Sequence, residues 1–442
     1  MHWMRKFGSD WGRLGMRCEW KDVRLGDICT KIGSGATPRG GKEVYKKEGI
    51  SLIRSQNVLD FVFSPDGLVY IDDEQARKLG NVIVQSGDVL INITGDSVAR
   101  VCLAPNEYLP ARVNQHVAIV RRNPKLAEER FILYKLQERK AYLLSIASTG
   151  GTRNALTKSM LEELSFLCPS LPEQKAIAAT LSCLDDKIEL NNKTSANLVA
   201  QAQAIFKSWF VDFEPFQAGE FVDSELGWMP KGWYIRSLDD VCDKITDGSH
   251  FSPRHSLFGE YPMLSVKDMD NYGFNYKSCK RISYDDFKTM EQNGCVPQIN
   301  DILVAKDGSY MKHVFIVNNN QPEAILSSIA IFRTNKSVIY PEILLYLLKD
   351  PTHQKNIKDN YVSGSALPRI VLKDFKKYKF ALPPIHVQDK LILLFSSFRK
   401  RIELNQKQNE TLAALRDTLL FKLMSGEIEV PITKDKESLK HD

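Results

Sequence analysis

Two long stretches of the chain carry apolar residues at alternating spacings of four and three, the heptad pattern of helices that pack along one seam. In the first stretch, at about 172–211, the seam positions are Ile177, Leu181, Leu184, Ile188, Asn191, Ser195, Leu198, Ala202, Ile205 and Trp209. In the second, at about 385–425, they are Leu391, Phe395, Phe398, Ile402, Asn405, Asn409, Leu412, Arg416, Leu419 and Leu423. Both seams turn polar at mid-length, and Arg416 is the one strong departure.

The two helices can pack on each other or each on its own domain. Asn191 and Asn405 occupy matching seam positions and favour mutual packing, because a buried asparagine fixes the register of a coiled coil. We therefore predict an antiparallel coiled coil. At 1.5 Å per residue, a helix of about 35 residues is roughly 50 Å long, so the pair would hold two modules at opposite ends.

Outside the helices, short apolar runs are separated by Gly, Pro, Asn and Asp, with helical stretches at 128–146 and 341–349. This mixture predicts an α+β fold. The two regions also match each other. Trp20 recurs as Trp233, Arg54 falls opposite Lys267, and the tetrapeptide at 188–191 recurs unchanged at 402–405. The chain is therefore predicted to be a duplication.

The expected order of parts follows from this repeat and from a linker rich in Gly and Pro. Residues 1–18 are expected to form a poorly ordered leader, with Met16 as an alternative start. Residues 19–168 form the first module, 169–211 the first helix and 212–229 the linker. Residues 230–382 form the second module, 383–428 the second helix and 429–442 a charged tail.

Length and composition narrow the class of protein. A chain of 442 residues exceeds the roughly 250–300 at which one core stops growing, so at least two domains are expected. The net charge of +6 permits a polyanionic partner without requiring one. The 8 cysteines form no C-x-x-C pair and the 8 histidines have no zinc-binding spacing, so we expect reduced thiols and no metal. No apolar run reaches the roughly 18 residues of a membrane span, and no signal peptide is evident, which favours the cytoplasm.

The sequence offers no catalytic motif. The stretch at 35–43 resembles a phosphate-binding loop only superficially, because Lys42 is displaced by one position, Glu43 replaces the hydroxyl residue and Pro38 has no amide hydrogen. There is no G-x-S-x-G elbow and no dinucleotide-binding G-x-G-x-x-G, and 382–385 lacks the amide and the aromatic residue of an amino-methyltransferase motif. We therefore predict a protein with no catalytic site and no cofactor of its own.

The candidate site consists of polar and basic loops at matching positions of the two modules. They suit duplex DNA, because Arg and Lys pair with guanine, Asn and Gln with adenine, and hydroxyl groups position phosphates. The expected contacts of the first module are Ser34, Thr37, Arg39, Lys42, Arg54, Gln56, Asn57, Thr94, Arg100, Asn114, Gln115 and Arg153. Those of the second module are Ser249, His250, Arg254, Lys267, Lys306, Ser309 and Lys312. For each of them the alternative is an ordinary solvated loop side chain.

Three features together resemble the specificity subunits of type I restriction-modification enzymes. They are Ile-Gly-Ser-Gly-Ala-Thr-Pro at 32–38, Pro-Ser-Leu-Pro-Glu-Gln-Lys-Ala-Ile at 169–177, and the two-fold repeat. The resemblance extends from about 19 to 428. The second repeat departs from the pattern: it keeps only Gln388 of the Glu-Gln pair, and its first loop reads Thr-Asp-Gly-Ser-His at 246–250.

The resemblance implies two target-recognition domains that each read half of a split double-stranded DNA sequence. Their helices would also dock two methyltransferase subunits, with restriction subunits in the full complex, and these partners would bind S-adenosylmethionine and ATP. One alternative is the DNA-reading subunit of a different methylation or restriction system. Another is a two-module protein adaptor, which would lack the steep salt dependence of phosphate binding.

Overall fold

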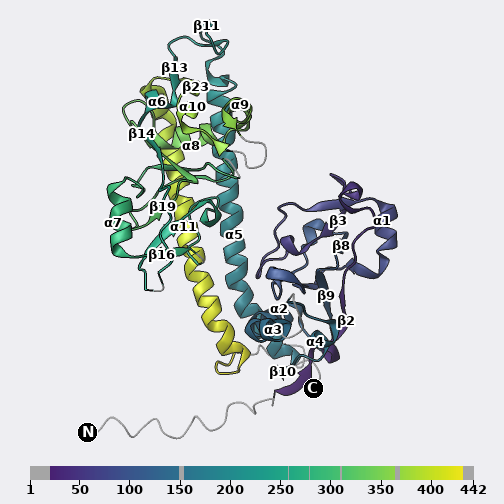
Figure 1. Ribbon diagram of the computed structural model, residues 1–442. Coiled ribbons are helices and arrows are strands. Elements are labelled where there is room, and N and C mark those ends of the chain that lie inside the picture. Colours follow the sequence, from purple (N-terminus) through teal and green to yellow (C-terminus); the bar gives the residue numbers. More distant parts are fainter. Residues whose placement is uncertain are drawn as a thin grey trace, which may run out of the picture. The chain divides into compact units, whose positions relative to one another are not determined.

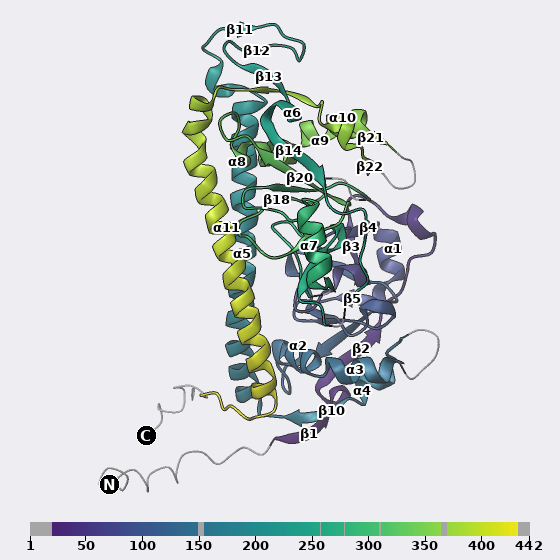
Figure 2. The same ribbon diagram turned by 60° about the vertical axis from the view of Figure 1, so that its left-hand side comes forward.

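The computed structural model describes residues 20–148, 154–256, 258–277, 279–308, 311–363 and 369–431. The chain divides into two compact units: unit 1 comprises residues 1–189 and 409–442, and unit 2 comprises residues 190–408. Each unit contains one module and a segment of both long helices, with the elements labelled in Figures 1 and 2. Among the helices in the described ranges, none combines the length and the apolar character that a bilayer crossing needs.

The two long helices are α5 (Leu171–Phe210) and α11 (Ile385–Met424), each of 40 residues (teal and yellow in Figure 1). At 1.5 Å per residue each is roughly 60 Å long. Pro172 lies in the first turn of α5 and Pro384 directly precedes α11. Proline is tolerated there because the first amide hydrogens of a helix have no intrahelical partner.

The seam of the predicted coiled coil is present in both units. All its predicted positions, Leu184, Ile188, Phe398 and Ile402 among them, are buried or half-buried. In unit 2, the Asn405 side-chain amide donates hydrogen bonds to the Asn191 backbone oxygen (3.3 Å) and to Ser195 Oγ (3.1 Å), and Asn191 Nδ2 donates to Gln408 Oε1 (2.9 Å). Partner numbers on α11 fall as those on α5 rise, so the paired segments are antiparallel.

The outer parts of the helices also pack on the modules. Ile177 and Leu181 belong to the core of unit 1, whereas Ala202 and Phe395 belong to a core of unit 2. Both arrangements that the heptad pattern allows are therefore present, because the helices pack on each other and on a module.

The module of unit 1 contains two four-stranded sheets and one two-stranded sheet. The first sheet has the order β2 (Cys29–Ser34), β9 (Val117–Arg122), β6 (Val89–Asn92) and β7 (Val101–Leu103). The second has the order β4 (Val69–Ile71), β3 (Ile50–Ile53), β8 (Ala111–Val113) and β5 (Ile83–Val84). The third pairs β1 (Lys21–Arg24) with β10 (Ser165–Cys168). The helices are α1 (Asp73–Lys78), α2 (Glu129–Glu138), α3 (Lys140–Ala147) and α4 (Lys158–Glu162).

The module of unit 2 repeats this order in its main sheet, and its second sheet has three strands where that of unit 1 has four. Its main sheet is β14 (Cys242–Asp247), β20 (Ile329–Thr334), β17 (Ile302–Ala305) and β18 (Val314–Ile316). Its second sheet is β16 (Lys280–Ile282), β15 (Tyr261–Leu264) and β19 (Ala324–Ile325). Two two-stranded sheets of the module pair β13 (Tyr234–Ser237) with β23 (Lys379–Leu382) and β21 (Val362–Ser363) with β22 (Arg369–Ile370), and β11 (Phe221–Val222) pairs with β12 (Met229–Pro230) along the stretch predicted as the linker. The helices are α6 (Leu238–Val241), α7 (Tyr284–Gln292), α8 (Pro341–Lys349), α9 (Pro351–Tyr361) and α10 (Leu372–Phe375).

Each main sheet has an apolar core on both faces. Along β6, Val89 and Ile91 join the core that contains α2, whereas Leu90 joins the core of the second sheet. Along β17, Ile302 and Leu303 divide in the same way. Because successive side chains of a strand point to opposite faces, a continuous apolar run is what a strand buried on both sides requires. The predicted α+β duplication is confirmed.

Two details differ from the sequence-based pairing. The stretch at 128–146 is two helices, with a break at Arg139. The predicted match of Arg54 to Lys267 is wrong by two residues. Arg54 begins a short turn in which its backbone N–H donates to Asn57 Oδ1 (3.0 Å), and Ser265 begins the equivalent turn, donating to Asp268 Oδ2 (2.9 Å). Gln56 is therefore the counterpart of Lys267.

One buried glutamine joins each module to its long helix. Gln174 of α5 donates from Nε2 to the backbone oxygens of Leu126 (3.1 Å) and Pro169 (3.0 Å), and its Oε1 accepts from the Glu128 N–H (3.1 Å). In unit 2, Gln388 of α11 makes the same three bonds, to Val338 (2.9 Å), Pro383 (3.1 Å) and Tyr340 (3.2 Å). This explains why glutamine alone persists in both copies of the Glu-Gln motif.

Candidate nucleic-acid interface

The first candidate loop of each module starts at a glycine that no other residue can replace. A Cβ on Gly35 would lie 2.0 Å from the Val113 backbone oxygen, and one on Gly248 would lie 2.2 Å from the Ile325 oxygen. The next residues, Ala36 and Ser249, donate backbone hydrogen bonds to those same oxygens (3.1 and 2.8 Å). The chain thus leaves β2 and β14 along the same path, and Thr37 and His250 occupy equivalent exposed positions.

In unit 1, an open groove brings together three of the predicted residues, Gln56 from the turn after β3 and Thr94 and Arg100 from the loop between β6 and β7. It is lined by Ser55, Gln56, Thr94, Gly95, Asp96, Ser97, Arg100 and His116. Within it, Thr94 Oγ1 and His116 Nδ1 are 2.6 Å apart, and Gln115 Nε2 lies 3.0 Å from His116 Nε2. The groove offers hydroxyl, amide, imidazole and guanidinium groups, which are the groups that contact base edges and phosphates.

The prediction missed Ser55, Asp96, Ser97 and His116, which complete this groove. His116 directly follows the predicted pair at 114–115, Ser55 directly precedes Gln56, and Asp96 and Ser97 lie between the predicted Thr94 and Arg100. The sequence shows that these loops are polar, but only the sheet order β9–β6–β7 shows that they converge.

Three predicted contacts are corrected, because their side chains are buried and hydrogen-bonded within the chain. Asn57 is 0% exposed and donates to the backbone oxygens of Ser64 and Asp66. Asn114 is 7% exposed and accepts a hydrogen bond from the His116 N–H. Lys306 is 3% exposed and forms an ion pair with Asp247. Taking these groups out of their hydrogen bonds to reach DNA would cost about 1–3 kcal/mol each, so we leave them out of the interface.

The remaining predicted residues lie at or near the surface. In unit 1, Ser34, Thr37, Arg39, Gln56 and Gln115 are exposed, and Arg54, Thr94 and Arg100 are half-buried. Arg54 is stacked 5.6 Å from the centre of the Tyr45 ring, which orients its guanidinium. In unit 2, His250, Arg254, Lys267 and Lys312 are exposed and Ser249 is half-buried. Arg153, Ser309 and the side chain of Lys42 lie outside the described residues.

The electrostatics differ between equivalent positions of the two modules. The backbone oxygens of Arg100 and His313 accept equivalent hydrogen bonds from Asn92 and Ala305, each at 2.9 Å. Burial lowers the pKa of His313 below its usual range, so the second module has a neutral ring where the first has a cation. Conversely, Lys267 provides a cation where the first module has the neutral Gln56. The same backbone frame therefore presents different charges in each module.

Catalytic chemistry has little support in the described ranges. No group of three or more His, Cys, Asp or Glu side chains there could hold a metal ion. Burial raises the pKa of Cys29 and of its counterpart Cys242 to about 12, which keeps both thiols protonated. Neither cysteine is therefore a nucleophile at neutral pH.

Comparison with known proteins gives consistent matches along the whole chain. A family model described as the type I restriction modification DNA specificity domain matches twice, at residues 18–200 and 230–414. The chain is 27% identical to the MjaIX type I restriction enzyme specificity subunit of Methanocaldococcus jannaschii, covering 93% of this chain and 94% of that protein. It is 25% identical to the HindI specificity subunit of Haemophilus influenzae, covering 93% and 100%. A crystal structure of a type I S subunit from M. genitalium aligns with a TM-score of 0.49 at 16% identity, covering 96% of this chain and 99% of that one.

Proposed function

This chain belongs to the type I restriction-modification DNA specificity family, and from this premise we propose that it is a DNA-reading subunit that recognises a two-part sequence in double-stranded DNA. In this proposal residues 19–168 and 230–382 are the two target-recognition domains. The helices at 169–211 and 383–428 separate them, and 212–229 is a linker. The chain supplies specificity and no catalysis.

The observation that carries the proposal is the pair of modules with one frame and different side chains. Thr37 is replaced by His250 and Gln56 by Lys267, at turns with the same backbone hydrogen bonds. A protein that reads two different half-sites needs this combination, because the frame sets the approach to DNA and the side chains determine the contacts with bases and phosphates. A structural adaptor has no such requirement.

The proposed DNA contacts are the predicted residues that the structure leaves at or near the surface. In the first domain they are Ser34, Thr37, Arg39, Arg54, Gln56, Thr94, Arg100 and Gln115. In the second they are Ser249, His250, Arg254, Lys267 and Lys312. The partners in this proposal are two methyltransferase subunits that dock on the long helices, and restriction subunits in the full complex.

The proposal is tested by co-expressing the chain with the methyltransferase encoded beside it and mapping methylated adenines across the host genome. We expect a two-part motif with a fixed gap that is lost when this chain is omitted. Alanine at Gln56 should relax one half of the motif, and alanine at His250 the other half. Methylation that is unchanged without the chain would refute the DNA-reading role for this pairing and favour the adaptor.

A further inference from the structure

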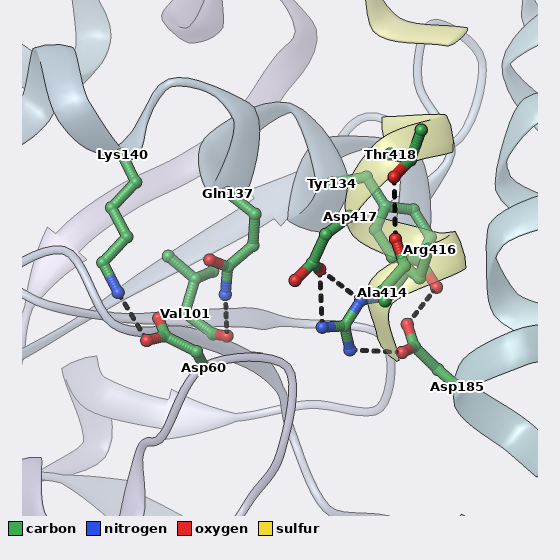
Figure 3. A network of polar contacts seen from close by, with 10 residues as sticks. All are labelled: Asp60, Val101, Tyr134, Gln137, Lys140, Asp185, Ala414, Arg416, Asp417 and Thr418. Carbon is green, nitrogen blue, oxygen red and sulfur yellow. Dashed lines mark hydrogen bonds and ion pairs between the residues drawn. The ribbon is translucent and has the colours of Figure 1, made fainter. Parts of the chain in front are cut away.

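In unit 1, the seam residue Arg416 of α11 fills a site between α5 and the first module (Figure 3). Its guanidinium lies 3.7 Å from the centre of the Phe61 ring. It donates to Asp185 Oδ1 at 2.8 Å, and the Tyr134 hydroxyl donates to Asp185 Oδ2 at 2.6 Å. Its Nε and Nη2 also donate to Asp417 Oδ1 at 3.0 and 2.7 Å, so a cation inside the chain is enclosed by an aromatic ring and two carboxylates.

Unit 2 has a cavity at the equivalent place. Its lining includes Tyr272, Tyr346 and Arg399, which are the counterparts of Phe61, Tyr134 and Asp185. The position of Arg416 along the seam is taken by Ala202, which carries no charge. The guanidinium that fills the site in unit 1 therefore has no counterpart in unit 2, and the carboxylate that holds it is replaced by a cation.

One lysine that lines the cavity has no partner for its charge among the described residues. Arg399 is neutralised by Glu342, with Nε 3.2 Å from Oε1. Lys349 also lines the cavity, but its ammonium group has no hydrogen bond or ion pair within the described ranges. At the equivalent position unit 1 has the neutral Gln137, which donates to the Val101 oxygen at 2.9 Å (Figure 3). Burial lowers the pKa of Lys349 to about 8, so the group is still mostly charged at pH 7.

The size and the walls of the cavity restrict what can neutralise this charge. Its volume of ≈ 40 Å³ accommodates about three water molecules or one group of that size. Much of the wall is apolar, formed by residues such as Phe315, Leu345 and Ile402. A divalent anion facing one free cation there would keep an uncompensated charge, whereas a monovalent anion would not.

We propose that this cavity of unit 2 is a binding site for a carboxylate group, held by Lys349 beside the Arg399–Glu342 pair. In unit 1 the chain supplies the cation of Arg416 to its own carboxylate, whereas in unit 2 Arg399 pairs with Glu342 and the anion for Lys349 comes from outside. Its source is either a small free carboxylate or an Asp or Glu side chain of a partner protein.

The test measures the thermal unfolding of the full chain at pH 7 while sodium acetate replaces sodium chloride at constant ionic strength. An acetate concentration about ten times Kd should raise the folding constant of unit 2 about tenfold. Lys349→Gln, which installs the residue found in unit 1, should abolish this response. Lys355→Gln is the matched control, because Lys355 is exposed on α9, and it should respond like the wild type.

Equal acetate responses in the wild type and Lys349→Gln, or no response in the wild type, would overturn the proposal. A response to phosphate as large as the response to acetate would overturn the assignment to a carboxylate. A second measurement does not depend on any variant. The resonance of ¹³C-acetate should broaden when the wild-type chain is added, and unlabelled acetate but not chloride should reverse the broadening. Absence of this broadening would also count against the site.

The source of the carboxylate is decided by repeating the acetate series on the complex with the methyltransferase, an arm that rests on the proposed function. If the acetate response disappears in the complex, the partner supplies the carboxylate; if it persists, the ligand is a free small molecule. The experiment on the free chain requires neither DNA nor methyltransferase. Failure of the site and failure of the proposed function are therefore distinguishable.

Discussion

Arg416 shows how a residue that breaks a pattern can carry a specific contact. The heptad spacing marks it as a charged residue in an apolar seam, and the structure gives the reason: its side chain is only 11% exposed and pairs with Asp185. Sequence alone identifies the anomaly. It cannot identify Phe61 and Asp185 as the partners, because they lie far away in the chain and only the fold brings them to the helix.

Replacing Arg416 by methionine is expected to destabilise unit 1 by about 2 kcal/mol. The change leaves the largely buried Asp185 carboxylate without its cation, and breaking such a pair is more costly than replacing both partners. Urea unfolding of the two proteins measures the difference. Arg401→Met is the control, because Arg401 is exposed on the same helix, and its effect should stay within about 0.5 kcal/mol. Equal effects of the two changes would contradict the role given to Arg416.

Burial is the property of single residues that the sequence conveys least. Gln56 and Asn57 are neighbours in one polar loop, yet Gln56 is exposed and Asn57 is fully buried. Composition supports both as DNA contacts. The distinction arises from a turn that directs Asn57 inward to cap backbone groups, and this turn depends on strands that are distant in sequence.

At the scale of elements, the long helices and their seam were predictable because the signal repeats over many turns. The polar layer of Asn191, Ser195 and Asn405 was also visible in the sequence as matching interruptions. The break at Arg139 was not, since no proline or glycine marks it. In the second module Pro351 follows the equivalent break and makes it evident.

The double change Asn191→Leu and Asn405→Leu is expected to preserve folding and to loosen the register of the helices. Leucine removes the hydrogen bonds that only one alignment satisfies, and apolar contacts tolerate several alignments. Methylome mapping of the double variant should therefore show added gap lengths between the half-sites. An unchanged single gap would mean that the modules, and not the polar layer, fix the register.

Gln388→Glu is expected to destabilise unit 2 by about 3 kcal/mol at pH 8 and by much less at pH 5. The new carboxylate would face the backbone oxygens of Val338 and Pro383 in a fully buried position, so its folded-state pKa lies above the unfolded value of about 4.3. The loss of stability is therefore absent below pH 4.3 and grows as pH rises to the folded-state pKa. Urea unfolding at the two pH values measures it.

The control is Gln292→Glu, at an exposed position of α7. It should change the stability little at either pH. A pH-independent loss in Gln388→Glu would show that shape, and not charge, makes glutamine necessary at the start of the helix.

At the scale of the whole molecule, the sequence shows the duplication. It does not show for every loop which residues of the two modules are equivalent. Most equivalent residues of the two modules are separated by a nearly constant number of positions in the sequence. The residues of the short turn after β3 and β15 are separated by a different number. Hydrogen bonds reveal the true pairing of Gln56 with Lys267. Residue identities do not reveal this pairing, because the two turns share their geometry and not their residue types.

This pairing predicts a difference between two single variants. Lys267→Ala should weaken binding to all DNA sequences and reduce the slope of log K against log salt by about 1, as expected for one lost phosphate contact. Gln56→Ala should leave the slope unchanged and lower the discrimination between bases in one half-site. Fluorescence anisotropy over a salt series, with specific and random duplexes, separates these outcomes. Equal salt slopes for Lys267→Ala and the wild type would exclude Lys267 as a phosphate contact.

The reversed charges of the two module–helix contacts have a consequence for synthesis of the chain. Arg130 of the first module pairs with Asp186 of α5 at 2.8 Å, whereas Glu342 of the second pairs with Arg399 of α11. A nascent second module that docked on the earlier helix segment would set Glu342 against Asp185 and Asp186. Like charges at a docking surface cost several kcal/mol. During synthesis, this repulsion therefore disfavours docking of the second module on the helix segment that belongs to the first.

The paired change Glu342→Arg and Arg399→Glu keeps the ion pair within unit 2. It also removes the repulsion of residue 342 by Asp185 and Asp186. We expect native stability near that of the wild type but a lower yield of monomeric protein on refolding from urea. An unchanged yield would show that the modules find their helices by shape alone. If the yield falls, the opposite charges of the two contacts prevent misdocking between the repeats. A duplicated gene can then still encode a chain with a single folded structure.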